Sequence, residues 1–355
     1  MKKIFLILIL IPFISLSQVI NKSLYYDGLN REYIIYVPAN YDGSINVPLF
    51  FSFHGGSGYA SDHMQMTNIN TISDTAGFIA VYPQGALDIN GAEPGNTPST
   101  SWLHKAPTTH NDVNFISSII DTLSNEYTID LDRIYACGYS EGGIFSYELA
   151  CRLSNKIAAI GSVSGSMLTE SFRTDYGFGN CSPAHPTAII LIPGTNDGSY
   201  HSLYSGFQPY YLSANEITNY WTSVNNTDLN PISSNVNNTN TNDGSTVEKY
   251  EWKNGDNCVS ITELKVVGGG HDWPGSFGNM DINASGEIWK FVSRFNINGM
   301  INCNTNQLQE NIFTKKKEII KTFDQLGRFI KKEQENHLYF YIYNDGSVEK
   351  RINLK

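Results

Sequence analysis

The chain has 355 residues, of which 41% are hydrophobic and 16% charged, and its formal net charge at pH 7 is -10. This length is sufficient for one large or two ordinary domains with a buried core. An acidic chain without a basic stripe is a poor candidate for a nucleic-acid-binding protein, so we exclude that class. The charge is uneven, because residues 315–355 carry ten Lys and Arg against six Asp and Glu. This asymmetry favours a separate C-terminal module.

The first seventeen residues have the pattern of a secretory signal peptide. Lys2 and Lys3 give a basic start, residues 4–14 are apolar, and residues 15–17 are typical of a cleavage site, so we expect cleavage near Ser17 or Gln18. The apolar run is much shorter than the roughly 20 residues that span a bilayer, which disfavours a membrane anchor. We therefore expect a secreted or cell-surface protein with no stable membrane span.

Export would permit disulfides among the five cysteines, Cys137, Cys151, Cys181, Cys258 and Cys303. Cys137 lies in an apolar run and is expected to be buried, whereas Cys181 and Cys258 lie in polar segments and are better disulfide candidates. The odd number leaves at least one cysteine free or paired outside the chain, and the pairing stays open. Because the chain has no close Cys/His cluster, we expect no zinc site.

From residue 19 onward, apolar strand patterns alternate with helical patterns. This alternation predicts an α/β fold, in which helices cover both faces of a mainly parallel sheet. The predicted strands are residues 31–37, 47–53, 78–82, 133–137, 157–163, 188–192 and 261–267, and the predicted helices are residues 66–75, 113–123, 144–153 and 285–295.

Two regions differ from this alternation. Residues 225–245 are rich in Asn, Thr and Ser, and we expect a surface loop or insertion, with a lid over the substrate as the alternative. The offsets of Gly and Glu in this run do not match a calcium-binding EF-hand loop. After a linker at residues 301–314, residues 315–355 predict a small all-β module with hairpin turns at 324–327 and 344–346.

Ser140 lies between two glycines in the pattern Gly138-x-Ser140-x-Gly142. The pattern alone would occur by chance in roughly one chain of this length in ten. Here, however, a predicted strand precedes it and a predicted helix follows it, which is the context of a nucleophile elbow. An ordinary serine hydroxyl is a weak nucleophile, so this role also requires a general base and a group that orients the base.

Both partners follow later strands in the chain order that this architecture requires. Asp197 comes just after strand 188–192, and His271 follows strand 261–267 and three glycines. We therefore predict a catalytic triad of Ser140, Asp197 and His271. The alternatives are that Asp197 is a turn residue and His271 a structural loop residue. Three other histidines compete for the base, but none follows a strand and a glycine loop: His185, His201 and His337.

The loop at residues 54–58, with the sequence HGGSG, follows strand 47–53. This is the position of an oxyanion hole, which holds a developing negative charge with backbone N–H groups. We expect Gly56 or Ser57 to supply one donor and Glu141 the other. The alternatives are a glycine-rich loop with no chemical role and a phosphate cradle, although no Gly-Lys-Ser/Thr follows.

Four aromatic residues are candidates for an acyl or aryl pocket, although aromatic side chains more often belong to a core. Trp273 is the strongest candidate because it lies two residues from His271. The others are Trp102, Tyr139 and Phe207.

Residues 31–295 resemble the secreted esterases of the polyhydroxybutyrate depolymerase and feruloyl esterase type, within the α/β-hydrolase superfamily and close to carbohydrate esterase family 1. The segments that carry the resemblance are REYIIYVP, FHGG, GFIAVYPQG, the helix start DVNF at residues 112–115, LDRIYACGYSEGG, LACRLSNKIAAIGSVSG, PGTND and GGGHDWPG. The resemblance implies Ser140 as nucleophile, Asp197 as acid and His271 as base, without a metal or organic cofactor. Pro193 replaces the usual His of the acid loop, and Asp272 replaces a usual Thr or small residue, so substrate choice is expected to differ.

The tail, with LGR at 326–328 and YNDGSVEKRI near its end, resembles the C-terminal sorting module of type IX secretion in Bacteroidetes. The resemblance implies that this secretion machinery exports the protein and removes the module or anchors it at the surface. The α/β domain, residues 18–300, would then act outside the cell.

Together these patterns predict a serine esterase whose substrate is feruloylated or acetylated plant polysaccharide or a hydroxyalkanoate polyester. Two alternatives remain open. One is a peptidase of the same superfamily, and the other is a non-catalytic protein that binds glycan in the same cleft.

Overall fold

The structure is a computed structural model that describes residues 16–88, 99–102, 111–175, 177–303, 319–325, 328–330, 337–343 and 348–353. The chain divides into two compact units, Met1–Cys303 and Asn304–Lys355. Nearly all of the predicted signal peptide and most of the predicted linker lie outside the described residues.

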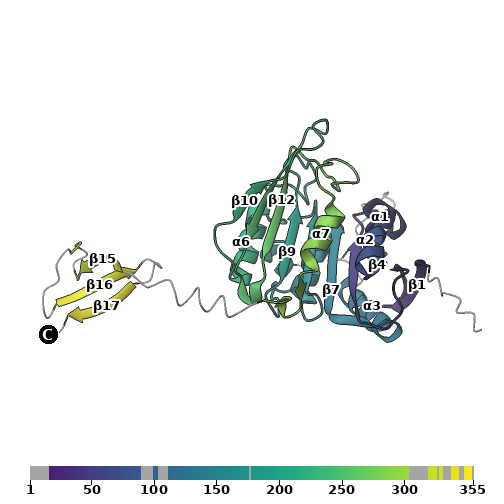
Figure 1. Ribbon diagram of the computed structural model, residues 1–355, viewed down its shortest axis with the longest axis horizontal. Coiled ribbons are helices and arrows are strands. Elements are labelled where there is room, and N and C mark those ends of the chain that lie inside the picture. Colours follow the sequence, from purple (N-terminus) through teal and green to yellow (C-terminus); the bar gives the residue numbers. More distant parts are fainter. Residues whose placement is uncertain are drawn as a thin grey trace, which may run out of the picture. The chain divides into compact units, whose positions relative to one another are not determined.

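A ten-stranded sheet forms the centre of the first unit, with the strand order β1-β2-β4-β3-β7-β8-β9-β12-β11-β10 (Figure 1). The strands from β4 to β12 in this order are parallel, and those at both edges are antiparallel. This confirms the predicted α/β class. In sheet order the strands are β1 (Gln18–Tyr26), β2 (Leu29–Val37), β4 (Ile79–Pro83), β3 (Val47–Phe53), β7 (Ile129–Tyr139), β8 (Ala159–Val163), β9 (Ala188–Ile192), β12 (Ile261–Val267), β11 (Thr246–Trp252) and β10 (Ile232–Asn235).

Helices cover both faces of the sheet (Figure 1). One hydrophobic cluster joins the sheet to α3 (Asp112–Glu126), α4 (Glu141–Arg152) and α6 (Ala214–Asn225). A second cluster joins the other face to α1 (Ala60–Thr67), α2 (Ile69–Ala76) and α7 (Ala284–Val292). Within β3, Phe51 belongs to the first cluster and Phe50 to the second, because successive strand side chains point to opposite faces. Shorter elements are α5 (Glu170–Asp175), η1 (Asp256–Cys258), β5 (Ala86–Asp88), β6 (Ser99–Ser101), β13 (Phe295–Asn296) and β14 (Gly299–Met300).

Several predicted elements have the predicted bounds, among them β3, β9 and β12. The predicted helix at 66–75 is instead two helices, α1 and α2. Asn68 between them has a left-handed backbone with φ 51°, and its N–H bonds to Met64 O and ends the first helix. The sequence patterns did not predict β1, α6 and β11, in which polar residues interrupt the apolar ones.

The Asn-rich run at 225–245 is not entirely loop. It contains β10, which pairs with β11 at the edge of the sheet. The backbone N–H groups of Thr239 and Asn240 both donate to the Asp281 carboxylate, at 2.6 and 2.9 Å. Hydrogen bonds therefore compensate for the lack of apolar side chains in this run.

Two disulfides link parts of the first unit that are distant in sequence. Cys151 pairs with Cys181, and Cys258 pairs with Cys303. Cys137 is a buried free thiol, as expected from its apolar surroundings. No helix in the described ranges is long and apolar enough to cross a membrane.

The second unit contains the predicted all-β module. Its described strands, β15 (Ile319–Asp324), β16 (His337–Tyr343) and β17 (Val348–Asn353), form an antiparallel sheet in that order. After β15 the backbone N–H of Arg328 donates to Asp324 Oδ1 at 2.9 Å, and residues 326–327 of the predicted turn at 324–327 lie outside the described residues. The predicted turn at 344–346 lies outside the described residues.

Candidate active site

Ser140 occupies a sharp turn between a strand and a helix. Strand β7 ends at Tyr139 and helix α4 begins at Glu141, so Ser140 alone makes the connection, with φ 55° and ψ -120°. A non-glycine residue in such a conformation costs about 1–3 kcal/mol, and strain of this kind is concentrated at functional sites. The Ser140 N–H donates to Val163 O on β8 at 2.9 Å, which fixes the turn against the sheet.

The flanking glycines are required by close backbone packing. A Cβ atom at Gly138 would lie 2.3 Å from the carbonyl carbon of Gly142. A Cβ atom at Gly142 would lie 2.2 Å from Phe53 O on β3. Both contacts are far inside van der Waals distance and involve backbone that cannot move aside. The glycine spacing around Ser140 is therefore a requirement of this turn.

Asp197 and His271 form a hydrogen-bonded pair, with 2.7 Å between Asp197 Oδ2 and His271 Nδ1. The Asp197 side chain is buried, and its Oδ1 accepts the N–H of Ser199 at 2.9 Å. Burial by itself raises the pKa of this carboxyl, but the hydrogen bonds from His271 and Ser199 outweigh burial and hold the pKa below its usual range. Because Nδ1–H donates to the carboxylate, Nε2 of His271 is left as an acceptor, as a general base requires.

Backbone hydrogen bonds hold the Asp197 and His271 loops together. Asn196 N–H donates to Gly269 O, and Gly268 N–H donates to Thr195 Oγ1, both at 2.8 Å. A Cβ atom at Gly194 would lie 2.3 Å from Gly270 O, so the loops touch backbone to backbone. This contact extends the parallel pairing of β9 and β12 beyond the sheet.

The hydrogen-bond partner of Ser140 is a histidine that the sequence patterns did not favour. His201 Nε2 lies 3.0 Å from Ser140 Oγ, whereas no hydrogen bond joins Ser140 to His271 within the described part of the chain. The rings of His201 and His271 are nearly perpendicular, and their centroids are 5.7 Å apart. The available signal was the position of His201 four residues after Asp197, in the same loop.

The loop at 54–58 lies against the start of α4. Ser57 N–H donates to Thr100 O at 2.8 Å, so Ser57 is not available as the oxyanion donor and Gly56 remains the candidate. A Cβ atom at Gly56 would lie 2.6 Å from the carboxyl group of Glu141. That buried carboxyl accepts the Ser101 hydroxyl at 3.1 Å. Glu141 is the first residue of α4, where backbone N–H groups point outward and favour negative charge.

His54 supports this loop as a neutral ring. Its Nε2 accepts the N–H of Gly85 at 2.9 Å, and its Nδ1 lies 2.6 Å from Gly55 O. Because a backbone N–H can only donate, Nε2 is the acceptor and Nδ1 carries the proton. Burial lowers the pKa of His54, consistent with the neutral form.

Two of the predicted substrate residues lie in the core. The Trp102 indole is fully buried and donates to His54 O at 2.8 Å, and the Trp273 indole is 1% exposed and donates to Ser285 Oγ at 3.1 Å. This corrects the expectation that these residues contact substrate, because a buried indole cannot reach it. Tyr139 is half-buried, and its hydroxyl donates to His271 O at 2.7 Å.

Exposed aromatic side chains instead lie in the loop that contains His201. The Tyr200 ring is 4.9 Å from the His201 ring and 5.7 Å from that of Phe207, measured between centroids. Phe207 in turn stacks on Tyr210 at 5.9 Å. The three side chains Tyr200, Phe207 and Tyr210, here called the aromatic patch, are 49%, 40% and 40% exposed.

The unusual residues Pro193 and Asp272 have structural contacts. Pro193 O accepts the N–H of Val266, and Asp272 Oδ2 accepts the N–H of Gly270, both at 2.9 Å. A Cβ atom at Gly278 would lie 2.1 Å from the Asp272 carboxyl carbon, so that carboxylate packs closely against Gly278. Asp272 therefore shapes the turn that presents His271.

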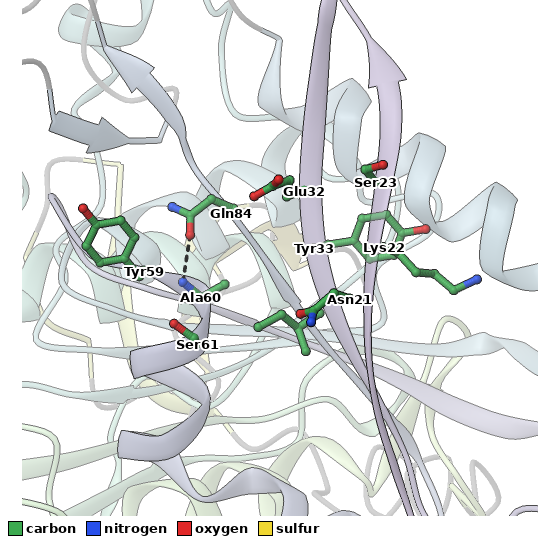
Figure 2. A pocket seen from close by; sticks show the side chains of 10 residues that line it. Asn21, Lys22, Ser23, Glu32, Tyr33, Tyr59, Ala60, Ser61 and Gln84 are labelled. Carbon is green, nitrogen blue, oxygen red and sulfur yellow. Dashed lines mark hydrogen bonds between the residues drawn. The ribbon is translucent and has the colours of Figure 1, made fainter.

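A cavity of about 440 Å³ is lined by residues of β1, β2, the start of α1 and Gln84, and none of the predicted triad lines it (Figure 2). Gln84 connects the cavity to His54 in the 54–58 loop. Its Oε1 accepts Ala60 N–H at 2.9 Å, and its Nε2 lies 3.1 Å from His54 Nε2. The lining residues are Asn21, Lys22, Ser23, Glu32, Tyr33, Ile34, Tyr59, Ala60, Ser61 and Gln84. Within the described ranges, no group of three or more His, Cys, Asp or Glu side chains is placed to hold a metal ion.

A mainly parallel sheet, a strained serine between strand and helix, and an Asp–His pair beyond later strands define the α/β-hydrolase fold. Residues 31–180 match the family model described as Esterase PHB depolymerase. Among solved structures, an acetyl xylan esterase from Aspergillus awamori superposes with a TM-score of 0.52 at 16% identity, over 77% of this chain and 98% of that chain. This likeness supports the fold.

Several curated relatives are named as esterases. A bifunctional acetylxylan esterase/xylanase from Neocallimastix patriciarum is 30% identical over 79% of this chain and 35% of its own length. Feruloyl esterase B from Piromyces equi is 26% identical over 75% of this chain and 46% of its own length. The chain thus spans less than half the length of these two relatives.

Proposed function

We propose that this protein is a serine carboxylic ester hydrolase that works through an acyl-enzyme on Ser140. The observation that carries the proposal is the 2.7 Å contact between Asp197 and His271 in a domain that also holds Ser140 on a strained elbow. The match of residues 31–180 to an esterase family supports the same reaction class.

In the first half-reaction, Ser140 Oγ attacks the ester carbonyl carbon while His271 Nε2 takes the hydroxyl proton. Asp197 stabilises the imidazolium that forms. The N–H groups of Gly56 and Glu141 hold the negative oxygen of the tetrahedral intermediate. The C–O bond to the alcohol then breaks, and His271 returns the proton to the departing alkoxide.

In the second half-reaction, water takes the place of the alcohol. His271 removes a proton from water, which attacks the acyl carbon, and the bond to Ser140 Oγ breaks. The acid leaves, and Ser140 regains its proton. A hydrogen bond from Ser140 to His271 forms in this cycle on substrate binding, since catalytic contacts often tighten only in the substrate complex.

The proposed substrate is an acetyl or feruloyl ester of plant polysaccharide. The names of the relatives support this class. The aromatic patch offers exposed rings that suit a planar aryl group or the face of a sugar, and its Tyr200 ring lies beside His201, which contacts Ser140. A hydroxyalkanoate polyester is the second candidate, favoured by the matching family model.

We propose that the enzyme acts outside the cell or at its surface, where polymeric substrates are found. The two disulfides support an oxidising compartment. The signal-peptide pattern of residues 1–17 and the tail module suggest the route, with the type IX machinery as the exporting partner.

A substrate panel tests the proposal. Methyl ferulate, acetylated xylan, polyhydroxybutyrate film and a p-nitrophenyl ester are each incubated with the wild type and with Ser140→Ala. We expect turnover of at least one ester by the wild type alone. Equal turnover by the variant would exclude Ser140 as the nucleophile, cleavage of peptides alone would indicate a peptidase, and glycan binding without turnover would indicate a binding protein.

A further inference from the structure

The contact between His201 and Ser140 has no role in the mechanism above. His201 Nε2 lies 3.0 Å from the oxygen that would attack the substrate. We propose that His201 is a fourth residue of the catalytic group, which donates a hydrogen bond from Nε2–H to Ser140 Oγ and orients the hydroxyl for His271. This inference rests on the proposed function, because it requires Ser140 to be the nucleophile.

The backbone around His201 is held on two sides. His201 O accepts the N–H of Ser166, in the loop after β8, at 3.1 Å, and the next residue, Ser202, donates its N–H to Ser199 O at 2.9 Å. The imidazole lies beside two tyrosine rings, 4.9 Å from Tyr200 and 6.4 Å from Tyr211 between centroids. These contacts present Nε2 to the serine.

The neighbouring side chain contacts the other histidine. Ser202 Oγ lies 3.1 Å from His271 Nδ1. Two consecutive residues of one turn therefore contact the two reacting side chains. Ser202 contacts His271, the proposed base, and His201 contacts Ser140, the proposed nucleophile. A shift of this turn would change both contacts together.

The chemistry of a hydroxyl selects the donor role for His201. A serine hydroxyl has one proton to donate and two lone pairs to accept hydrogen bonds. If His201 Nε2–H donates to a lone pair, the hydroxyl proton stays available for His271, whose Nδ1–H is already committed to Asp197. If Ser140 donated to His201 instead, its proton would be directed away from the Asp197–His271 pair.

The donor also favours the reaction itself. As the proton moves from Ser140 to His271, negative charge grows on Oγ, and an N–H group already aimed at that oxygen stabilises the charge. No other proton transfer is required of His201.

Two substitutions of His201 distinguish the effect of its N–H group from the effect of its bulk. His201→Leu removes the N–H group and retains bulk, whereas His201→Gln retains a side-chain N–H donor. For each variant we would measure kcat and KM with a p-nitrophenyl ester, the rate at which an organophosphonate labels Ser140, and the thermal midpoint. His337→Leu, on β16 of the other unit, is the matched control.

We expect His201→Leu to lower kcat and the labelling rate about 10- to 100-fold, the value of one hydrogen bond to a charged group, with KM changed less than about twofold. His201→Gln should recover most of the loss, and His337→Leu should match the wild type. An unchanged labelling rate in His201→Leu would overturn the proposal, as would an equal loss in both His201 variants.

A third substitution tests the choice of base. If His271→Ala retained more activity than His201→Leu, His201 would be the base and its assignment as donor would be wrong. The proposed function fails in a different way, namely if the wild type hydrolyses no ester and its Ser140 takes no label. The two failures are therefore distinguishable in the same set of measurements.

Discussion

Asp197 Oδ2 and His271 Nδ1 are 2.7 Å apart although 74 positions separate the two residues in the sequence. The buried carboxylate fixes the imidazole tautomer and would stabilise its protonated form during acyl transfer. Asp197→Asn keeps the shape but removes the charge and permits the wrong tautomer. We expect kcat to fall by about 10³- to 10⁴-fold while KM changes little.

Steady-state kinetics with a p-nitrophenyl ester measure this effect. Asp228→Asn is the control, because Asp228 is exposed and bonds to Asn254 away from the site. A loss of less than tenfold in Asp197→Asn would mean that another group orients His271.

Substitution of a glycine beside Ser140 is expected to lower the free energy of unfolding. In Gly142→Ala the new Cβ would lie 2.2 Å from Phe53 O, and the strand and helix would have to separate. We expect the free energy of unfolding to fall by about 3 kcal/mol or more, by analogy with overpacked cores. Urea denaturation measures the change. In the control Gly198→Ala the added Cβ meets open space, and a similar loss there would refute the steric explanation.

Because His54 and His63 are buried, we expect the free energy of unfolding to depend on pH. Burial lowers the pKa of His63 to about 3, and the pKa of His54 is lowered for the same reason. In the unfolded chain both rings bind protons below about pH 6.5. The unfolded state therefore binds more protons between about pH 6.5 and the folded pKa, so the free energy of unfolding falls as the pH falls through this window.

Each such histidine contributes a slope of up to about 1.4 kcal/mol per pH unit. Urea denaturation at about pH 6 and pH 5 measures the slope in the wild type and in His63→Gln. The variant loses the contact of His63 Nε2 with Ser52 Oγ and should be less stable, but its slope should be smaller. Identical slopes would show that His63 takes up a proton in the folded state.

The aromatic patch predicts a preference for aryl or glycan esters. Phe207 is 40% exposed and stacks on Tyr210 with 17° between the ring planes. In Phe207→Ala we expect KM for methyl ferulate to rise about 2- to 10-fold, the value of one aromatic contact, and KM for an acetyl ester without an aryl group to change less. Tyr25→Ala, on β1, is a control that also removes an exposed ring. Equal effects on the two esters would exclude an aryl-binding role.

Local patterns predicted much of this fold. Largely apolar runs correctly predicted β3 and β9, because strands of a covered parallel sheet are buried on both faces. The weaker prediction at 66–75 failed because one left-handed residue, Asn68, divides the segment into two helices. Edge strand β1 alternates exposed and half-buried residues and gave no clear apolar signal.

By itself the sequence determined the inner strands of the central sheet and the tight turn at Ser140, because apolar runs and glycine spacing act over a few residues. Only the tertiary structure decided which groups meet Ser140. It placed His201 on the serine hydroxyl, joined Ser57 N–H to Thr100, and buried the indole of Trp273. These contacts depend on how strand-end loops pack across the edge of the sheet. Segments far apart in the chain determine that packing, and no local pattern encodes it.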